Sequence, residues 1–361
     1  MRPEIPGERA LAANYSPLGR HNLDLIPVYG VPLVARDTGV IRLGHLSGRA
    51  TCRQLTPKQD GASSGAVCHG AVSVGTCKDG GIMAKNETAR AVDLDVEEFY
   101  ARSLGAFANA VEQVIVTSHQ CASRDAGARR FWASLLFTRI CSTGVSILWL
   151  CPGSPVNRSG LHWDFSSVAS LCRNLFETAL IMYYLGIDPV SDEEWKARLG
   201  VVQVHDCMGR FRMFRDFDPN DPHLRGFQAQ ADELRTTLQA NAFFMDLPDA
   251  QRKKLLNGEQ ACFLNQDQIL QRMGEFEQQT RGYYRFLSSH THSFPLAFYR
   301  MADDNRGRGE ESDAEKGYMA GAVEFAAKVV GRATEDMRSA FRDVVTFVPG
   351  TFDWRQLRRA R

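Results

Sequence analysis

Apolar residues recur every three to four positions along most of the chain after residue 93, which is the spacing of the buried face of an α-helix. Runs that alternate apolar and polar residues, as strands do, are nearly absent there. The pattern predicts helices at Leu94–Ile115, Arg130–Leu150, Trp163–Leu185, Glu193–Phe217, Leu224–Met245, Gln268–His292 and Glu315–Val345. We therefore predict an all-α fold, a bundle of about seven helices between residues 90 and 350.

Glycine and proline mark where several of these helices should stop. Pro152-Gly153 follows the second helix, Gly186 follows the third, and the run from Asp218 to Pro222 separates the fourth from the fifth. The polar stretch from Ala302 to Lys316 is expected to be a solvated loop before the last helix.

The first 82 residues differ from the rest in composition. They contain 12 Gly and 6 Pro, and none of the 21 Phe or 5 Trp of the chain. One interpretation is a loop-rich or disordered extension with a few short strands, for example at Leu25–Gly30. The other, which we favour, is that Met83 is the true start and that the upstream residues are an over-extended reading frame. Either way, we divide the chain into residues 1–82 and an all-α domain at 83–361.

Charge and composition exclude several classes of protein. With 43 Lys and Arg against 42 Asp and Glu, the chain does not have the bulk positive charge of a protein built mainly to grip nucleic acid. The longest apolar stretch, Ala133–Cys151, contains Arg139, and the N-terminus lacks a signal-peptide core, so we expect a cytoplasmic protein that does not span a membrane.

The nine cysteines do not indicate a metal site. They form no C-x-x-C pair, and the one Cys/His cluster, Cys68-His69 with Cys77, lacks a fourth ligand at useful spacing. We expect free thiols, no bound metal and no cofactor.

The third predicted helix is apolar on most sides, as a central helix is. A polar stripe nevertheless runs along it at helical spacing and consists of Ser166, Ser170, Arg173, Glu177 and Tyr184. Arg173 and Glu177 are one turn apart and can pair. Because buried charges are costly unless compensated, the stripe is either an ion pair satisfied within the core or the wall of a polar pocket.

The predicted helix at Gln268–His292 carries a second polar face. This face begins at Arg281, and Arg285, Ser288 and His292 follow it by 4, 7 and 11 residues. These spacings bring all four side chains to nearly the same angle around the helix axis. His290 lies on the opposite side. A guanidinium, a hydroxyl and an imidazole placed together can bind an anion or perform acid–base chemistry on a phosphate.

These residues also carry two resemblances. Arg173-Asn174-Leu175-Phe176-Glu177 followed by Tyr284-Arg285-x-Leu287-Ser288-x-x-x-His292 resembles an uncharacterised bacterial family of all-helical domains, over about residues 95 to 300. The spacing Arg285-x6-His292 is similar to the Arg-x4-6-His signature of HEPN domains. Arg285-x4-His290 and Arg198-x6-His205 also fit that spacing, but only the first pair shares a helix face late in the bundle.

The HEPN resemblance implies a metal-independent ribonuclease of a toxin or defence system, acting as a homodimer in which Arg and His of two protomers meet. Under this hypothesis Arg285 binds the scissile phosphate, His292 is the general base or acid, and Ser288 holds a phosphate oxygen. Glu177 orients the imidazole if the two helices are neighbours. The remaining candidates, Arg173, Arg281 and Tyr284, contact the substrate RNA.

Two other functions remain open. The first is a non-catalytic helical scaffold that binds a protein partner or a small anion. The second is an HD-type metal phosphohydrolase, which His205-Asp206 would indicate if His162 and either Asp218 or Asp232 completed the ligand set.

Overall fold

The computed structural model describes residues 95–122, 127–159, 161–274, 277–299, 301, 306–342, 350 and 352–355. This part of the chain holds eleven α-helices, α2 to α12, and its β-structure is limited to an isolated bridge between Trp163 and Gly309. The prediction of an all-α fold is confirmed. Residues 1–82, for which two interpretations were open, lie outside the described residues.

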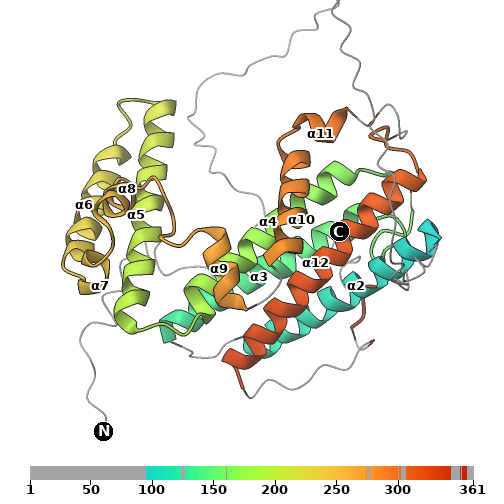
Figure 1. Cartoon of the computed structure of the whole chain (residues 1–361), viewed down its shortest axis with the longest axis horizontal. Coiled ribbons are helices and arrows are strands. Elements are labelled where there is room, and N and C mark those ends of the chain that lie inside the picture. Colours follow the sequence, from blue (N-terminus) through green and yellow to red (C-terminus); the bar gives the residue numbers. More distant parts are fainter. Residues whose placement is uncertain are drawn as a thin grey trace, which may run out of the picture. The chain divides into compact units, whose positions relative to one another are not determined.

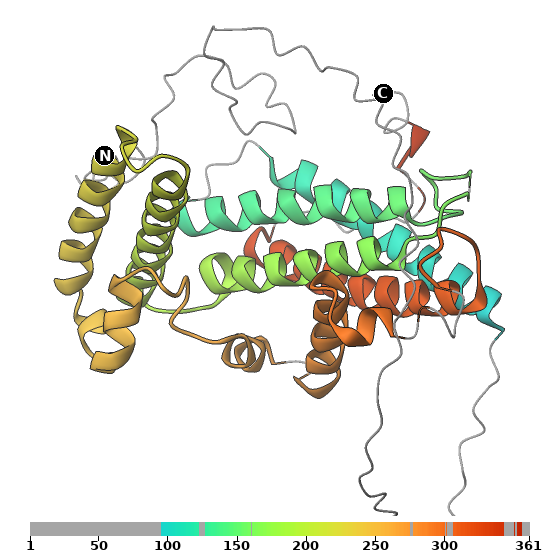
Figure 2. The same cartoon turned by 90° about the horizontal axis from the view of Figure 1, so that it is seen from above.

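Four long helices form the main bundle (Figure 1). They are α2 (Val96–Cys121), α3 (Gly127–Leu150), α4 (Phe165–Met182) and α12 (Asp313–Ala340). Figure 2 shows α3 and α4 running side by side, and α12 packs along both α2 and α4. In this bundle α4 therefore packs against its neighbour in sequence, α3, and against the last helix of the described chain, α12.

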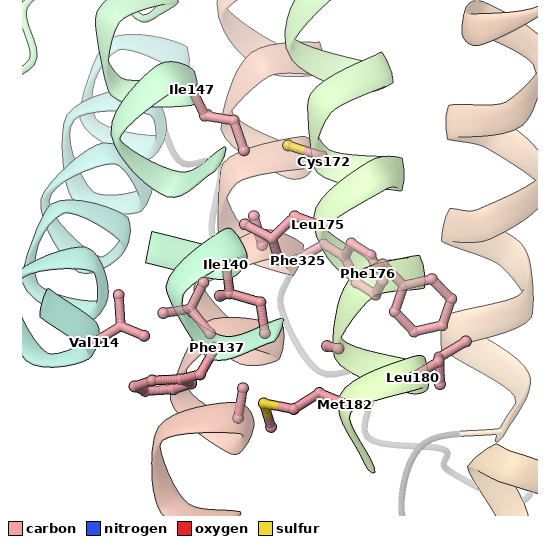
Figure 3. Packing of buried hydrophobic residues seen from close by; sticks show 14 of the residues in the cluster. Val114, Phe137, Ile140, Ile147, Cys172, Leu175, Phe176, Leu180, Met182 and Phe325 are labelled. Carbon is pink, nitrogen blue, oxygen red and sulfur yellow. The ribbon is translucent and has the colours of Figure 1, made fainter. Parts of the chain in front are cut away.

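The core lies where α4 meets these neighbours (Figure 3). Cys172, Leu175 and Met182 of α4 are fully buried, as are Phe137 and Ile140 of α3. The prediction that α4 is a central helix is therefore confirmed, and its polar stripe must be accommodated inside or beside a packed core.

A second group of helices packs across one end of the bundle. Figure 2 shows α5 (Asp192–Phe217) and α6 (His223–Gln239) at a steep angle to α3 and α4. The short helices α7 (Ala242–Met245) and α8 (Asp249–Leu256) pack against α5. A five-residue π-helical turn, Tyr183–Ile187, joins α4 to this group.

The chain then returns to the bundle through α9 (Gln266–Met273), α10 (Glu277–Thr291) and α11 (Pro295–Phe298). The helix α10 packs against α4, and α11 lies just beyond the end of α10 (Figure 1). This contact brings the two polar faces identified in the sequence to the same place.

Two predicted helices prove to be broken. Leu224–Met245 is α6 and α7, because the Asn241 side chain accepts a hydrogen bond from Phe244 N and starts a new helix. Gln268–His292 is α9 and α10, because Gly274 takes a left-handed conformation, φ 77°, that ends α9. The periodicity continued across both breaks, so it did not reveal them.

The stretch at 302–316 was expected to be a solvated loop, but several of its described residues are buried. Arg306 is 4% exposed and lies over the Tyr318 ring, and Glu315 is 2% exposed and accepts a hydrogen bond from Gly307 N. The last helix also begins earlier than predicted, at Asp313, and ends at Ala340 rather than Val345.

Among the described helices, α3 is long and apolar enough to cross a membrane by length and composition. It packs against α2, α4 and α12. Core helices meet the same criterion, so this composition alone is weak evidence for a membrane span.

Candidate functional site

The polar stripe of α4 contains the predicted ion pair. Arg173 Nη2 lies 3.0 Å from Glu177 Oε1, one helical turn away. The Arg173 side chain is 16% exposed and that of Glu177 43%, so the pair sits at the edge of the core rather than inside it. A partly exposed pair of this kind can be reached by a ligand.

Tyr284 of α10 closes this pair into a ring of three residues. Its hydroxyl donates to Glu177 Oε1 at 3.2 Å and accepts from Arg173 Nη2 at 3.3 Å. The Arg173 guanidinium also lies over the Tyr284 ring, 5.3 Å from its centroid. These contacts fix the position of the guanidinium between the two helices.

His292, directly after α10, completes the cluster. Its Nε2 lies 2.6 Å from Arg173 Nη1. Because a guanidinium only donates hydrogen bonds, Nε2 must carry its lone pair, which places the ring proton on Nδ1. The structure thus holds His292 as a neutral imidazole whose basic nitrogen points at a cation.

The Arg173 side chain stays positively charged in this environment. Burial lowers the pKa of Arg173, but the hydrogen bond with Tyr284 and the charge of Glu177 outweigh it and raise this pKa above its ordinary value. Arg173 is a permanent cation, which is what binding of a phosphate requires.

Three buried polar atoms on α4 and α10 have no hydrogen-bond partner among the described residues. They are Arg173 Nε, Asn174 Oδ1 and Ser288 Oγ. Buried polar atoms are usually satisfied, and those without a partner are often completed by water or a ligand. Arg173 Nε and Ser288 Oγ are donors from the two helices that also carry His292 and Glu177, and they could bind an anion.

Two other predicted site residues, Arg281 and Arg285, lie outside this ring of contacts. The guanidinium of Arg281 pairs with Asp267 of α9 at 2.8 Å. Arg285 is exposed, two turns before His292 on the same helix face. The contacts of Glu177 are with Arg173 and Tyr284, so it reaches the imidazole only through Arg173.

The pairing of Arg173 with His292 is the feature that the sequence did not reveal. We expected His292 to act with Arg285, on the same helix, whereas the structure places the guanidinium of Arg173, 119 residues earlier, against its ring. The available signal was the charge pair on an otherwise apolar helix, which identified Arg173 but not its neighbour.

The other two Arg–His spacings do not bring their side chains together. Arg198 is fully buried between Asp188, at 2.7 Å, and Glu194, at 2.5 Å. His205 instead bonds the carbonyl of Gly258 through Nδ1 at 3.0 Å. His290 is 5% exposed, and its ring lies 4.6 Å from that of Phe165 and 5.0 Å from that of Phe286.

The ligand set of an HD-type hydrolase does not assemble. Asp206 pairs with Arg210, and Asp232 pairs with Arg235 at 2.6 Å. Across the residues that the structure describes, no group of three or more His, Cys, Asp and Glu side chains could hold a metal ion. The metal-dependent alternative therefore gains no geometric support.

Comparisons with known proteins place the chain in a family. A family model described as a family of unknown function (DUF5677) matches residues 130–310, half of the chain, and this range includes α4, α10 and the whole Arg173–His292 cluster. No curated protein and no solved structure matches the chain. The resemblance to an uncharacterised domain family is thus confirmed at the level of a family without known activity. The chain belongs to the DUF5677 family of unknown function.

Proposed function

We propose that this protein is a metal-independent ribonuclease, as the HEPN resemblance implies, but with Arg173 rather than Arg285 beside His292. The observation that carries the proposal is the 2.6 Å contact between a permanently charged guanidinium and a neutral imidazole nitrogen at a partly exposed surface. Cleavage of RNA without a metal needs a cation for the phosphate and a base for the 2′-hydroxyl, and these two groups supply both.

Arg173 binds the scissile phosphate in this mechanism. Its Nη1 is released when His292 turns to the substrate, and its N–H groups then become available to a phosphate oxygen. Its Nε, which has no partner, points to the other edge of the guanidinium and is not needed for this contact. Ser288 Oγ, also without a partner, donates to a further oxygen. Glu177 and Tyr284 hold the guanidinium in place and do not touch the reacting atoms.

His292 then accepts the proton of the 2′-hydroxyl on Nε2. The 2′-oxygen attacks phosphorus, the bond to the 5′-oxygen breaks, and water protonates the leaving oxygen. The hydroxide left from that water takes the proton from His292, which restores the imidazole. The products are a 2′,3′-cyclic phosphate and a 5′-hydroxyl. Arg285, exposed on the same face of α10, contacts a neighbouring phosphate.

RNA is the proposed substrate, and the homodimer implied by the HEPN resemblance stays a prediction. The pair of Arg173 and His292 comes from a single chain, so this mechanism does not depend on a second protomer for these two groups.

A non-catalytic scaffold that binds a small anion is the second candidate. The observation that favours it is the closed ring of contacts among Arg173, Glu177 and Tyr284, which resembles a fixed binding site more than a mobile catalytic one. Such a protein would bind phosphate groups without cleaving RNA.

The test is cleavage of a labelled RNA by the full-length protein in EDTA. We expect cleavage by the wild type and a loss of roughly 100-fold or more in His292→Ala, because a general base contributes about 10²–10⁴ to the rate. His223→Ala, an exposed histidine of α6, is the matched control and should cleave like the wild type.

Circular dichroism establishes that the variants remain folded. Cleavage that needs added metal, or that survives in His292→Ala, would refute the ribonuclease. Phosphate binding that depends on Arg173 without any cleavage would establish the scaffold instead.

A further inference from the structure

Large apolar side chains are exposed around α11. Phe294 is 53% exposed, Leu296 50%, Phe298 46% and Tyr299 71%, all within six residues. An isolated exposed apolar side chain is ordinary, but a contiguous group of them usually marks a binding surface. We call these four residues the α11 surface.

The α11 surface is continuous with the candidate site. The ring of Phe294 lies 5.4 Å from the imidazole of His292, which is itself bonded to Arg173. Figure 1 shows α11 directly beyond the end of α10. His292 is the residue that follows the last residue of α10, Thr291. A molecule with its phosphate at Arg173 would therefore have its adjoining groups next to these side chains.

The backbone between the site and this surface is held in an uncommon conformation. Ser293 has φ 50°, the one positive value at a non-glycine position among the described residues. Hydrogen bonds from Ser293 N to His290 O and from Phe294 N to Ser289 O hold this turn, and the buried Ala297 anchors α11. Such strain is tolerated where surrounding contacts enforce it and is concentrated at functional sites.

The chemistry of the surface favours one kind of occupant. Exposed aromatic rings beside arginines bind single-stranded nucleic acid, because each base stacks on a ring while the cations contact the backbone. Paired bases within a helix cannot stack in this way. Phe298 and Tyr299 lie edge to face at 4.9 Å, and Arg285 supplies an exposed positive charge on the adjoining helix.

We propose that Phe294, Phe298 and Tyr299 form a stacking surface for unpaired bases, which restricts the substrate to single-stranded RNA. This inference rests on the proposed ribonuclease, since it takes the phosphate at Arg173 as its reference point. The surface binds the bases next to the scissile phosphate and takes no part in the chemistry.

Binding to an RNA that cannot be cleaved separates this inference from catalysis. The probe is a fluorescein-labelled single-stranded 2′-O-methyl oligonucleotide, measured by fluorescence anisotropy with the full-length protein. The comparison probes are its duplex and an abasic strand of the same length. We expect the single strand to bind more tightly than either.

Substitutions on the α11 surface should weaken only the base-dependent part of binding. Phe298→Ala and Tyr299→Ala are expected to raise the Kd for the single strand by roughly 5- to 100-fold and to leave the Kd for the abasic strand nearly unchanged. Tyr299→Phe keeps the ring and should bind like the wild type. Phe217→Ala removes a ring that is more exposed than either, 82% exposed on α5, and should have no effect.

The cleavage and binding measurements distinguish a failure of the ribonuclease from a failure of the stacking surface. His292→Ala should lose cleavage and keep binding. If the wild type binds single strands through these rings but never cleaves RNA, the ribonuclease is refuted and the stacking surface stands. If Phe298→Ala and Tyr299→Ala bind like the wild type, the stacking surface is refuted. It is also refuted if these variants instead lower the oligomeric state in size-exclusion chromatography, because the surface would then be a protein interface.

Discussion

Two histidines at the end of α10 are two residues apart and have opposite environments. His292 is exposed and accepts a hydrogen bond from Arg173, whereas His290 is buried between Phe165 and Phe286. Both ring nitrogens of His290 lack a hydrogen-bond partner among the described residues. A helix turns about 200° over two residues, so the first histidine points into the bundle and the second out of it.

The environment of His290 predicts a loss of stability in acid. Burial, with a smaller effect from the positive charge of Arg306, lowers the pKa of His290 to about 4 from 6.5. The unfolded chain therefore binds the proton more readily than the folded one. Above pH 6.5 His290 should therefore cost the folded protein almost no stability. As the pH drops from 6.5 toward 4, the free energy of unfolding should fall, by roughly 2 kcal/mol between pH 7 and 5.

Urea unfolding at several pH values checks this prediction. The variant His290→Leu has no proton to bind and should lose about 2 kcal/mol less than the wild type between pH 7 and 5. Both proteins have the same carboxylates, so the difference between their losses of unfolding free energy excludes the contribution of those groups. Equal pH dependence in the two proteins would show that His290 does not control it.

The end of α4 illustrates how an element depends on its neighbours. Gly186 was expected to stop the helix, but the winding continues as a π-helical turn to Ile187. A Cβ at Gly186 would lie 2.5 Å from the Cβ and 2.9 Å from the backbone nitrogen of Ala133 on α3. The glycine is needed here because it allows two helices to approach closely, and not because it ends one of them.

Gly186→Ala should therefore destabilise the protein by roughly 1–3 kcal/mol, since α3 and the π-helical turn must move apart. Gly105→Ala is the matched control, because a Cβ at this exposed position of α2 meets nothing within 4 Å. It should be neutral or stabilise by about 0.5–1 kcal/mol, as alanine favours a helix over glycine. Thermal unfolding of both variants measures the contrast, and equal effects would contradict the packing explanation.

At the scale of the whole molecule, the family match is smaller than the structural unit. The match begins at residue 130 and ends at residue 310. The helices α2 and α12 lie outside this range, and they pack on each other and on the rest of the bundle. Together they bury residues such as Phe107 and Val111 of α2 and Met319 and Val323 of α12. Without them the apolar sides of α3 and α4 would face water.

A fragment of residues 130–310 should consequently fail to fold as a cooperative unit. We expect it to show little helical circular dichroism or to aggregate, whereas residues 83–361 and the full-length protein, which both contain α2 and α12, should unfold cooperatively. Circular dichroism and thermal unfolding compare the three chains. Cooperative unfolding of the short fragment would mean that α2 and α12 are accessory to the fold.

Much of the fold could be predicted because a helix is a local structure. The spacing of apolar residues located α3, α4, α5 and most of α2, and the i, i+4 relation of Arg173 and Glu177 predicted their contact. The breaks at Asn241 and Gly274 were missed because one residue with a cap or a positive φ interrupts a helix without disturbing the average pattern. The burial of Arg306 was missed because its sequence neighbours are polar.

The sequence by itself determined the fold class, the central position of α4 and the membership of Arg173 and Glu177 in one polar face and of His292 in another, since these follow from periods of 3.6 residues within one helix. Only the tertiary structure decided that the two faces meet, and that Arg173 rather than Arg285 is the partner of His292. Which helix packs against which depends on long-range burial of apolar surface, and many arrangements satisfy the same local pattern. The candidate site is a contact between α4 and α10, so it exists only once that choice has been made.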